Sequence, residues 1–285
     1  MTELARTQAA SRPQAVPRPA LLLPMWSLFR REIVRFLRQR GRVMGALGTP
    51  VLFWLVLGSG FGASLTGLGS NAEGGYLTYF FPGMLVMVVL FTAIFSSISI
   101  IQDRNEGFLQ GVLAAPVSRL AIVLGKVLGG AALGLGQGML LLALAPLAGL
   151  PLGPLQALEA CGVLGLMAVA LSALGFLFAW GTDSVQGFHA IMNLLLFPMW
   201  MLSGAFFPES GASLWLKWVM RVNPLTYGLS ALRAVLEGGA ALEGGAGLPA
   251  AAATGPGASL SLIVLLAFST AAVALAVWIA ARPQK

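Results

Sequence analysis

The 285-residue sequence has few charged residues, one histidine and one cysteine. Charged residues make up only 9% of the chain and hydrophobic residues 58%, a balance that would leave a soluble domain with too little polar surface. The single cysteine, Cys161, can form neither a disulfide within the chain nor a cysteine-based metal site. The composition therefore argues against a soluble fold or a disulfide-stabilised scaffold, and it indicates an integral membrane protein.

Motifs that carry catalysis are also missing. The Gly-x-x-x-x-Gly-Lys-Ser/Thr motif of P-loop ATPases is absent, because Leu120 stands where a glycine would have to precede Gly125 and Lys126. His189, the only histidine, leaves a histidine-based zinc site without partners. Asp183 lies near His189, but a membrane-embedded lipid transferase would need a further base or metal ligand. We therefore expect no catalytic site, no metal site and no ATP hydrolysis in this chain.

The net charge of +7 is concentrated at the amino end, where nine of the seventeen lysines and arginines precede position 43. This distribution indicates membrane topology rather than a surface for nucleic acid. Residues 1–24 carry Arg6, Arg12 and Arg18 without periodic apolar positions, so we expect a disordered cytoplasmic tail. The apolar run Leu21–Leu23 is much shorter than the roughly 7 to 15 residues that a signal peptide needs.

Residues 25–42 have the pattern of an amphipathic, basic helix. Apolar side chains recur there at steps of three and four residues, whereas the arginines Arg31, Arg35 and Arg38 face away from them. Such a helix lies in the membrane interface with its arginines toward anionic head groups. The apolar positions are Trp26, Phe29, Ile33, Phe36 and Leu37. A simple juxtamembrane anchor and a role in coupling are both compatible with this pattern.

Residues 43–285 contain six apolar segments, each near the roughly 20 residues that cross a membrane. They are 43–62, 80–101, 120–148, 155–180, 188–206 and 260–281. An even number of spans puts both termini on one side, and the arginine-rich amino end makes that side cytoplasmic. The sequence thus predicts an all-α, six-span protein of the inner (plasma) membrane with both termini in the cytoplasm.

The third segment is rich in glycines spaced four residues apart, which allow helices to approach closely. The pairs overlap at Gly125, Gly129, Gly130, Gly134 and Gly138, so they cannot all face one neighbour, and we expect most to pack within the chain. Lys126 lies one to two turns into this segment, close enough to its end for the long side chain to reach the membrane surface. No carboxylate falls near the bilayer midplane, which disfavours an ion-gradient-driven secondary transporter or channel, although this class stays open as the alternative.

Residues 206–260 are too polar to span the membrane and too apolar to lie free in solvent. We expect two short helices in the outer leaflet, separated at Asn223 and Pro224, with Trp215 and Trp218 at the level of the head groups. The stretch 238–257 is expected to be a flexible loop. Three basic residues fall on this outer side, and anchoring beneath the lipid head groups is their preferred role over contact with an anionic substrate. They are Lys217, Arg221 and Arg233.

The loop 101–120, IQDRNEGFLQGVLAAPVSRL, holds most of the charge between the spans. Phe108, Leu109 and Leu113 recur at helical spacing, and Pro116 ends the pattern. We expect a short amphipathic helix parallel to the membrane with its polar end available to a cytoplasmic partner. An ordinary turn between two spans is the alternative.

The order of residues in this loop resembles the permease subunits of ABC type-2 exporters, in particular the drug and lipo-oligosaccharide branch. The match comprises Arg104, Gly107, Leu109, Leu113, Pro116, Ser118 and Arg119. LSGAFFPES at 202–210 and NPLTYGLSALR at 223–233 resemble the hairpin that precedes the last span in that family. The resemblance extends from about Trp26 to Ala281 and includes three motifs in the expected order.

The resemblance implies an exporter built from two permease subunits and two ATPase subunits. ATP and Mg²⁺ would be bound by the partner ATPase, with no cofactor in this chain, and a homodimer in contact with membrane lipids is expected. Substrates of the family include hydrophobic drugs, lipids and lipid-linked glycans. They would pass along the dimer interface, between the first, second and fifth spans of each copy. Pro50, Pro82 and Pro198 would permit bending there or form fixed kinks.

The resemblance also assigns three groups of site residues, with Glu106 expected to be the main acidic contact of the ATPase. Arg104 and Arg119 are expected to fix helix ends or meet phosphate head groups. The coupling residues would be Asp103, Arg104, Glu106, Phe108, Leu109, Leu113, Pro116 and Arg119; the interface-helix residues Trp26, Phe29, Arg31 and Arg35; and the outer-leaflet hairpin residues Gly204, Pro208, Asn223, Pro224, Tyr227 and Arg233.

Overall fold

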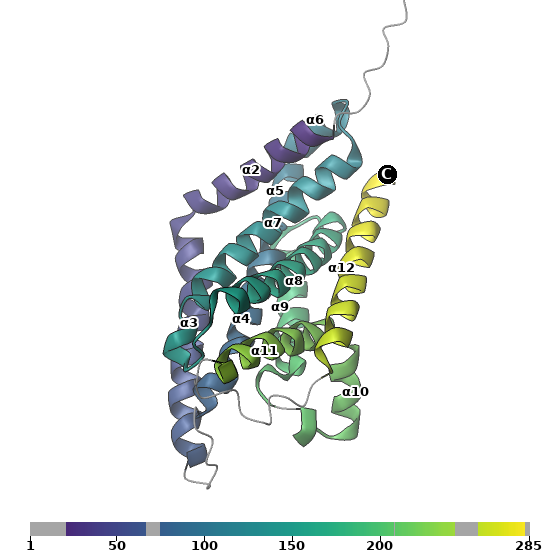
Figure 1. Ribbon diagram of the computed structural model, residues 1–285. Coiled ribbons are helices and arrows are strands. Elements are labelled where there is room, and N and C mark those ends of the chain that lie inside the picture. Colours follow the sequence, from purple (N-terminus) through teal and green to yellow (C-terminus); the bar gives the residue numbers. More distant parts are fainter. Residues whose placement is uncertain (1–20, 67–74, 208, 243–255, 283–285) are drawn as a thin grey trace, which may run out of the picture.

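The computed structural model describes residues 21–66, 75–207, 209–242 and 256–282 (Figure 1). This part of the chain is a bundle of helices without a β-strand, which confirms the all-α prediction. The bundle has two ends, which we call the α2 end and the α10 end after the helices that lie there (Figure 1). Residues 1–20 of the predicted tail 1–24 lie outside the described residues. So do Pro208 and most of the predicted loop 238–257.

The first two helices meet at a sharp corner. Helix α2 (Leu22–Arg38) is inclined across the α2 end, and α3 (Arg40–Thr66) then runs along the bundle toward the α10 end (Figure 1). Gln39 has a non-helical conformation and separates the two helices. The predicted boundaries 25–42 are therefore wrong by a few residues, because the helix begins before Pro24, which its first turn accommodates, and residues 40–42 belong to α3.

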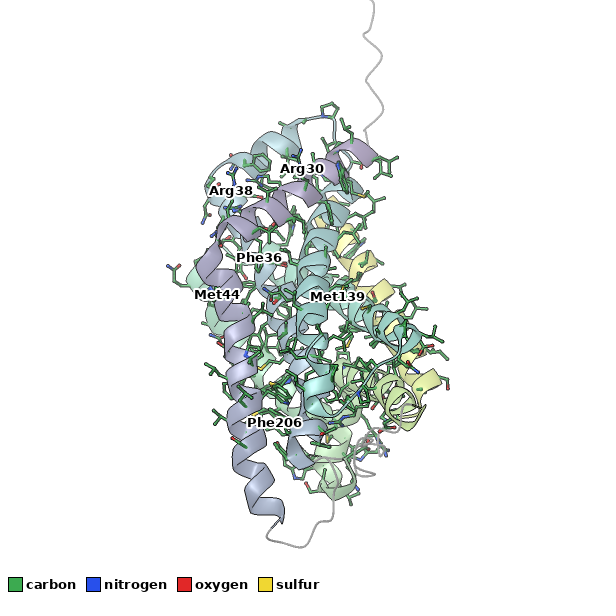
Figure 2. The ribbon with its side chains drawn as sticks, turned by 60° about the vertical axis from the view of Figure 1, so that its left-hand side comes forward. Arg30, Phe36, Arg38, Met44, Met139 and Phe206 are labelled. Carbon is green, nitrogen blue, oxygen red and sulfur yellow. The ribbon has the colours of Figure 1, made fainter. Side chains whose placement is uncertain are left out.

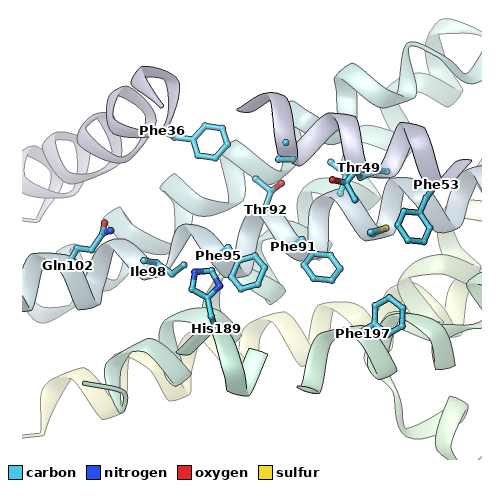
Figure 3. Close-up of a pocket in the computed structure, with 15 residues that line it drawn as sticks. Phe36, Thr49, Phe53, Phe91, Thr92, Phe95, Ile98, Gln102, His189 and Phe197 are labelled. Carbon is cyan, nitrogen blue, oxygen red and sulfur yellow. The ribbon is translucent and has the colours of Figure 1, made fainter. Parts of the chain in front are cut away.

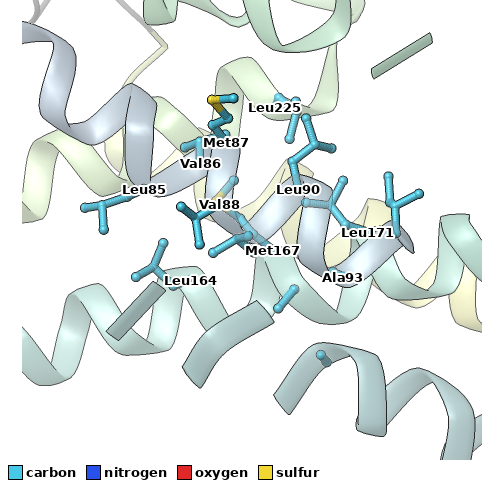
Figure 4. Close-up of a cluster of buried hydrophobic side chains, with 14 of the residues drawn as sticks. Leu85, Val86, Met87, Val88, Leu90, Ala93, Leu164, Met167, Leu171 and Leu225 are labelled. Carbon is cyan, nitrogen blue, oxygen red and sulfur yellow. The ribbon is translucent and has the colours of Figure 1, made fainter. Parts of the chain in front are cut away.

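Three long helices form the centre of the bundle: α4 (Gly75–Ser96), α7 (Arg119–Leu142) and α8 (Pro154–Trp180). Buried side chains of α4, such as Leu85 and Leu90, pack with Leu164 and Met167 of α8 (Figure 4). Nearly all of α4 is buried, as expected of a helix that reads as continuously apolar and is surrounded on all sides.

The glycines of α7 let two different sets of helices approach it. A Cβ built on Gly125 would lie 2.8 Å from Cβ of Leu28, and one on Gly129 would lie 2.8 Å from Cβ of Glu32, both on α2. The opposite set, Gly134 and Gly138, faces α4 and α8. The prediction that most of these glycines pack within the chain is confirmed.

The remaining helices cover this centre. A turn at Ser97 leads from α4 to α5 (Ile98–Asn105), which is followed by α6 (Phe108–Ala114) at the α2 end. Helix α12 (Ala258–Ala281) packs on α8 and returns to the α2 end (Figure 1). The other elements are the short η2 (Ala145–Ala148), α9 (Val185–Trp200), the π-helix η3 (Met201–Ala205), η4 (Glu209–Gly211), α10 (Leu214–Val222) and α11 (Pro224–Leu242).

Five of these helical stretches are long and apolar enough to cross a membrane. They are Tyr76–Asn105, Arg119–Leu142, Pro154–Trp180, Val185–Ala205 and Ala258–Ala281, close to five of the six predicted segments. The third predicted segment is too long, because α7 ends at Leu142 and a separate helical turn with Pro146 follows. In α3 the apolar stretch is the shorter Met44–Leu57, so the sixth span stays a prediction.

Candidate functional site

Lys126 of α7 is buried at the α2 end, with its ammonium between two carboxylates from other helices. Nζ lies 2.6 Å from Oε1 of Glu32 on α2 and also donates to Asp103 on α5. A third hydrogen bond, 3.2 Å long, runs from Nζ to the hydroxyl of Ser99. The ammonium of Lys126 does not extend to the membrane surface, because the side chain is buried and pairs with two carboxylates inside the protein.

Asp103 is fully buried and binds three cations. Arg31 donates two parallel hydrogen bonds of 2.7 Å to its two carboxylate oxygens, and Arg35 adds one of 2.9 Å. The hydrogen bond to Asp103 raises the pKa of the Arg31 guanidinium above its usual value, so the pair stays ionised. Arg35 also lies 3.3 Å from Glu106, whose side chain is exposed.

We call these six residues the ion cluster: Arg31, Glu32, Arg35, Asp103, Glu106 and Lys126. Its three positive and three negative charges balance, as buried charges require. The prediction that the arginines of α2 face lipid head groups is wrong for Arg31 and Arg35, which turn toward the bundle. Arg38 lies on the exposed side of α2, and Figure 2 shows it at the α2 end together with Arg30.

The ion cluster ties the segment α5–α6 to the bundle. Gly107 has a φ of +75°, which makes the tight turn from α5 into α6, and Arg31 lies 3.8 Å above the ring of Phe108. Leu109 lies on the buried face of α6. Pro116, in the loop that follows, and Arg119, at the start of α7, are exposed. Trp26 is also exposed and stacks on Phe29 at 5.2 Å.

Arg104 binds the carboxyl end of α8 and does not belong to the ion cluster. Its guanidinium donates to the carbonyl oxygens of Trp180 at 2.6 Å and Thr182 at 3.2 Å. Cations near the last carbonyls of a helix stabilise them. The Asp183 carboxylate lies 3.5 Å away and is almost fully exposed. The turn between α8 and α9 is thus fastened to α5.

At the α10 end the carbonyl of Gly204 is an acceptor for two buried donors. The hydroxyl of Tyr79 and the guanidinium of Arg233 each donate to it at 3.0 Å. Gly204 has a φ of +92°, a conformation that favours glycine. The expectation that Arg233 lies beneath lipid head groups is wrong, because its side chain is buried against η3 and over the ring of Tyr79.

Asn223 and Pro224 separate α10 from α11, as predicted. The Asn223 amide donates to the carbonyl of Met199 at 2.6 Å, and its oxygen accepts from the backbone N–H of Leu225. The Tyr227 hydroxyl donates to the carbonyl of Arg221 at 2.8 Å. Pro208, predicted to belong to the same hairpin, lies outside the described residues.

A cavity of about 680 Å³ opens between α3, α4 and α9 (Figure 3). Its floor is α4, with Met87, Val88 and Thr92, while Phe53 of α3 and Phe197 of α9 flank it. The other lining residues are Phe36, Gly45, Ala46, Thr49, Pro50, Phe91, Phe95, Ile98, Gln102 and His189. Pro50 therefore borders the cavity, whereas Pro82 lies in α4 and Pro198 lines a separate groove beside α10.

Sequence reasoning missed Glu32 and assigned Lys126 to the wrong environment. A signal for both was available. Glu32 stands between Leu28 and Phe36 at intervals of four residues, on the face that α2 buries. An ionisable side chain inside an apolar span needs a partner, and Glu32 and Asp103 were the nearest carboxylates in the neighbouring amphipathic segments.

Comparison with known proteins gave two results. The sequence profile of the family described as "ABC-2 type transporter" matches residues 24–236, about three quarters of the chain. The chain is also 26% identical, over 211 residues, to the protein named "Putative transport permease ycf38" of Cyanophora paradoxa, an alignment that covers 73% of this chain and 72% of the relative.

Proposed function

The chain belongs to the ABC-2 type transporter family and is a multi-pass transport permease subunit, and on that premise we propose that it exports its substrate with energy from a separate ATPase. ATP and Mg²⁺ would be bound by that partner. Two copies of this chain would form the transmembrane part, in the inner (plasma) membrane, with six spans and both termini in the cytoplasm.

The observation that carries the proposal is the ion cluster at the α2 end. An ATPase would bind the exposed surface formed by Glu106, which directly follows α5, and by Phe108 of α6, with Leu113 half-buried on the same helix. Three neighbouring elements meet at the ion cluster, because Arg31 and Glu32 come from α2, Asp103 from α5 and Lys126 from α7. A displacement of α6 by the partner would reach α7 through charges that cannot separate without a large cost.

In this proposal the role of Asp103 differs from the predicted one, which was to contact the ATPase. It has no exposed surface, so it would act as a positioning residue that holds α2 to α5. Glu106 keeps the role of an exposed contact, although Arg35 already compensates part of its charge. The direct contacts would be Glu106, Phe108, Leu113, Pro116 and Arg119, and the exposed Trp26 of α2 would lie beside them or in the lipid interface.

The test is co-purification in detergent with the products of neighbouring genes, followed by ATP hydrolysis and transport in proteoliposomes. We expect an ATPase to co-purify, and Glu106→Lys to release it or to lower transport per ATP hydrolysed. Asp183→Lys is the matched control, because Asp183 is an exposed carboxylate at the same end but outside α5–α6.

Two results would contradict the proposal. If no ATPase co-purifies and an ion gradient alone drives transport, the chain works as a secondary transporter. If Glu106→Lys and Asp183→Lys lower coupling equally, α6 has no special place in the contact and only the net charge of this surface matters.

A further inference from the structure

Two buried polar atoms of α11 lack a hydrogen-bond partner, and their residues lie about one helical turn apart. Nε of Arg233 donates no hydrogen bond, and Oε1 of Glu237 accepts none. Both residues belong to α11, which lies toward the α10 end of the bundle (Figure 1). Buried polar atoms are nearly always hydrogen-bonded, so an unused donor and an unused acceptor this close together need an explanation.

We propose that Glu237 is a proton-binding site and that its ionisation moves Arg233 away from the carbonyl of Gly204. With Glu237 protonated, Arg233 donates to Gly204, as in the conformation described above. With Glu237 ionised, Arg233 pairs with Glu237 instead. The inference goes beyond the proposed function and depends on it only for the side from which the proton comes, which would be the outer side.

The buried guanidinium of Arg233 is held by neutral groups. It donates to the carbonyl of Gly204 at 3.0 Å and lies 4.5 Å above the ring of Tyr79. Among the described residues no carboxylate forms an ion pair with it, although the side chain is only 6% exposed. A carboxylate binds a guanidinium more strongly than a carbonyl does, so an ionised carboxylate within reach would compete with Gly204 for Arg233.

Glu237 is within that reach. Side chains four residues apart lie on the same face of a helix and can meet. The Glu237 side chain is half-buried, and this burial raises the pKa of its carboxyl above the ordinary value, an effect that the nearby Arg233 partly offsets. An ionised Glu237 beside this guanidinium would form an ion pair, so the absence of the pair fits a protonated carboxyl.

The other elements that pack on α11 bring no competing charge to Glu237. Neither η3 nor α12 contains a titratable side chain. Among the titratable groups of the packed helices and of α11 itself, only Arg233 acts electrostatically on the Glu237 carboxyl. The titratable residues of α4, α8 and α10 are Tyr76, Tyr79, Glu159, Cys161, Lys217 and Arg221.

The exchange of partners leaves no buried acceptor unsatisfied. When Arg233 leaves Gly204, the carbonyl keeps the hydroxyl of Tyr79, which donates to it at 3.0 Å. Glu237 gains a donor at the same time. The segment that changes is η3, because Gly204 lies in this π-helix with a φ of +92° and loses one of its two side-chain donors. Since η3 follows α9 directly, ionisation of Glu237 loosens the end of α9.

The direction of the pH effect follows from the two environments of Glu237. In the described conformation burial raises the pKa of Glu237, whereas an ion pair with Arg233 would lower it. The proton therefore binds more tightly to the described conformation and stabilises the contact between Arg233 and Gly204. That contact is complete at low pH and is lost as the pH rises through the raised pKa.

Infrared spectroscopy tests the proton site directly. The full chain in nanodiscs is titrated while the C=O stretch of protonated carboxylic acids is recorded. We expect a band that persists above the ordinary pKa of glutamic acid, about 4.3. The band should be absent from Glu237→Gln and unchanged in Glu159→Gln, the matched control, because Glu159 is an exposed carboxylate on α8.

Hydrogen exchange measured by mass spectrometry tests the effect on η3. Variants are compared only at equal pH, because the chemistry of exchange itself depends on pH. Well above the infrared midpoint, η3 should exchange roughly tenfold more slowly in Glu237→Gln than in the unmodified chain, since a neutral amide competes weakly for Arg233. Below the midpoint the two should agree. In an Arg233→Gln background, Glu237→Gln should have no effect on η3.

Three outcomes would overturn the inference. Without an infrared band that depends on Glu237, the residue is no proton site. Equal exchange of η3 in the unmodified chain and in Glu237→Gln above the midpoint would show that ionisation does not move Arg233. An equal slowing in Glu159→Gln would assign the effect to net charge. Both measurements use the chain alone, so an ATPase that co-purifies while Glu237 does not titrate would keep the transporter and reject the proton site.

Discussion

At the scale of single residues, the charges of the α2 end determine what each side chain can do. Lys126 is almost completely buried and has Glu32 and Asp103 as its anionic partners, while Arg31 and Arg35 bind Asp103 as well. Asp103 therefore keeps two cations if Lys126 is lost, but Glu32 keeps none in the ion cluster. The most sensitive point of the cluster is thus the pair between Lys126 and Glu32.

Lys126→Met should destabilise the protein strongly, because it leaves Glu32 as a buried charge without its cation. Removing one partner of a buried pair costs about 3–5 kcal/mol. The measurement is the thermal midpoint of the detergent-solubilised protein, followed by size-exclusion chromatography. Lys217→Met is the control, since Lys217 is partly exposed on α10 and outside the ion cluster.

The double variant Lys126→Met with Glu32→Gln should recover part of this loss, because the remaining polar group is neutral. Equal midpoints for the single and double variants would show that the buried charge of Glu32 is not the cause. A midpoint of Lys126→Met equal to that of Lys217→Met would contradict the burial of the pair altogether.

Gly204 is the second residue at which the backbone conformation and the contacts restrict substitution. A side chain at a φ of +92° is strained, and the carbonyl of Gly204 has to remain where Tyr79 and Arg233 can donate to it. We expect Gly204→Ala to cost about 1–2 kcal/mol. Thermal midpoints should show the loss in Gly204→Ala and not in Gly211→Ala, where a Cβ would meet nothing within 4 Å.

At the scale of elements, α7 is the helix on which the others depend. Its glycines admit α2 on one face and α4 with α8 on another, and its lysine binds the cluster that fixes α5. Close packing of small residues is the main source of affinity between membrane helices, because lipid removes the hydrophobic driving force. The position of α2 is therefore set by glycines as well as by charge.

Gly125→Ala should weaken the contact between α2 and α7, because its Cβ would lie 2.8 Å from Cβ of Leu28 and 3.0 Å from the carbonyl oxygen of Met25. Overpacking of this kind costs about 1–3 kcal/mol. On the same helix, Gly136→Ala adds a methyl group to open space and should be neutral or stabilising by up to about 1 kcal/mol. The folded yield and thermal midpoint distinguish them, and a midpoint of Gly125→Ala at or above that of Gly136→Ala would refute the close approach.

Hydropathy and the residues that start and end helices predicted most elements well. Five apolar segments, the break at Asn223 and Pro224, and the small helix before Pro116 follow from local patterns that act over one or two turns. The ion cluster did not follow, because Glu32, Asp103 and Lys126 are distant in sequence and their pairing depends on how α2 crosses α7. Arg233 was assigned to the surface for the same reason.

At the scale of the whole molecule, the two ends differ in their chemistry. The α2 end holds the ion cluster and the exposed arginines Arg30 and Arg38, while the α10 end holds buried hydrogen bonds around Gly204 and the exposed Trp215 and Trp218 (Figures 1 and 2). Phe206 lies toward the α10 end (Figure 2). Basic residues favour the cytoplasmic side, so this asymmetry supports the proposal that the α2 end faces the cytoplasm.

Single-cysteine labelling tests both this orientation and the sixth span. In a Cys161→Ala background, Ser27→Cys and Asp183→Cys lie at the α2 end and Ser213→Cys precedes α10, each at an exposed position. In intact cells, a membrane-impermeant maleimide should label Ser213→Cys, and it should label the other two after permeabilisation. If α3 did not cross the membrane, Ser27→Cys would be labelled together with Ser213→Cys, since Ser27 precedes α3 and the five other spans follow it. Labelling of Asp183→Cys in intact cells, with Ser213→Cys protected, would instead reverse the orientation and place α6 where no cytoplasmic ATPase could reach it.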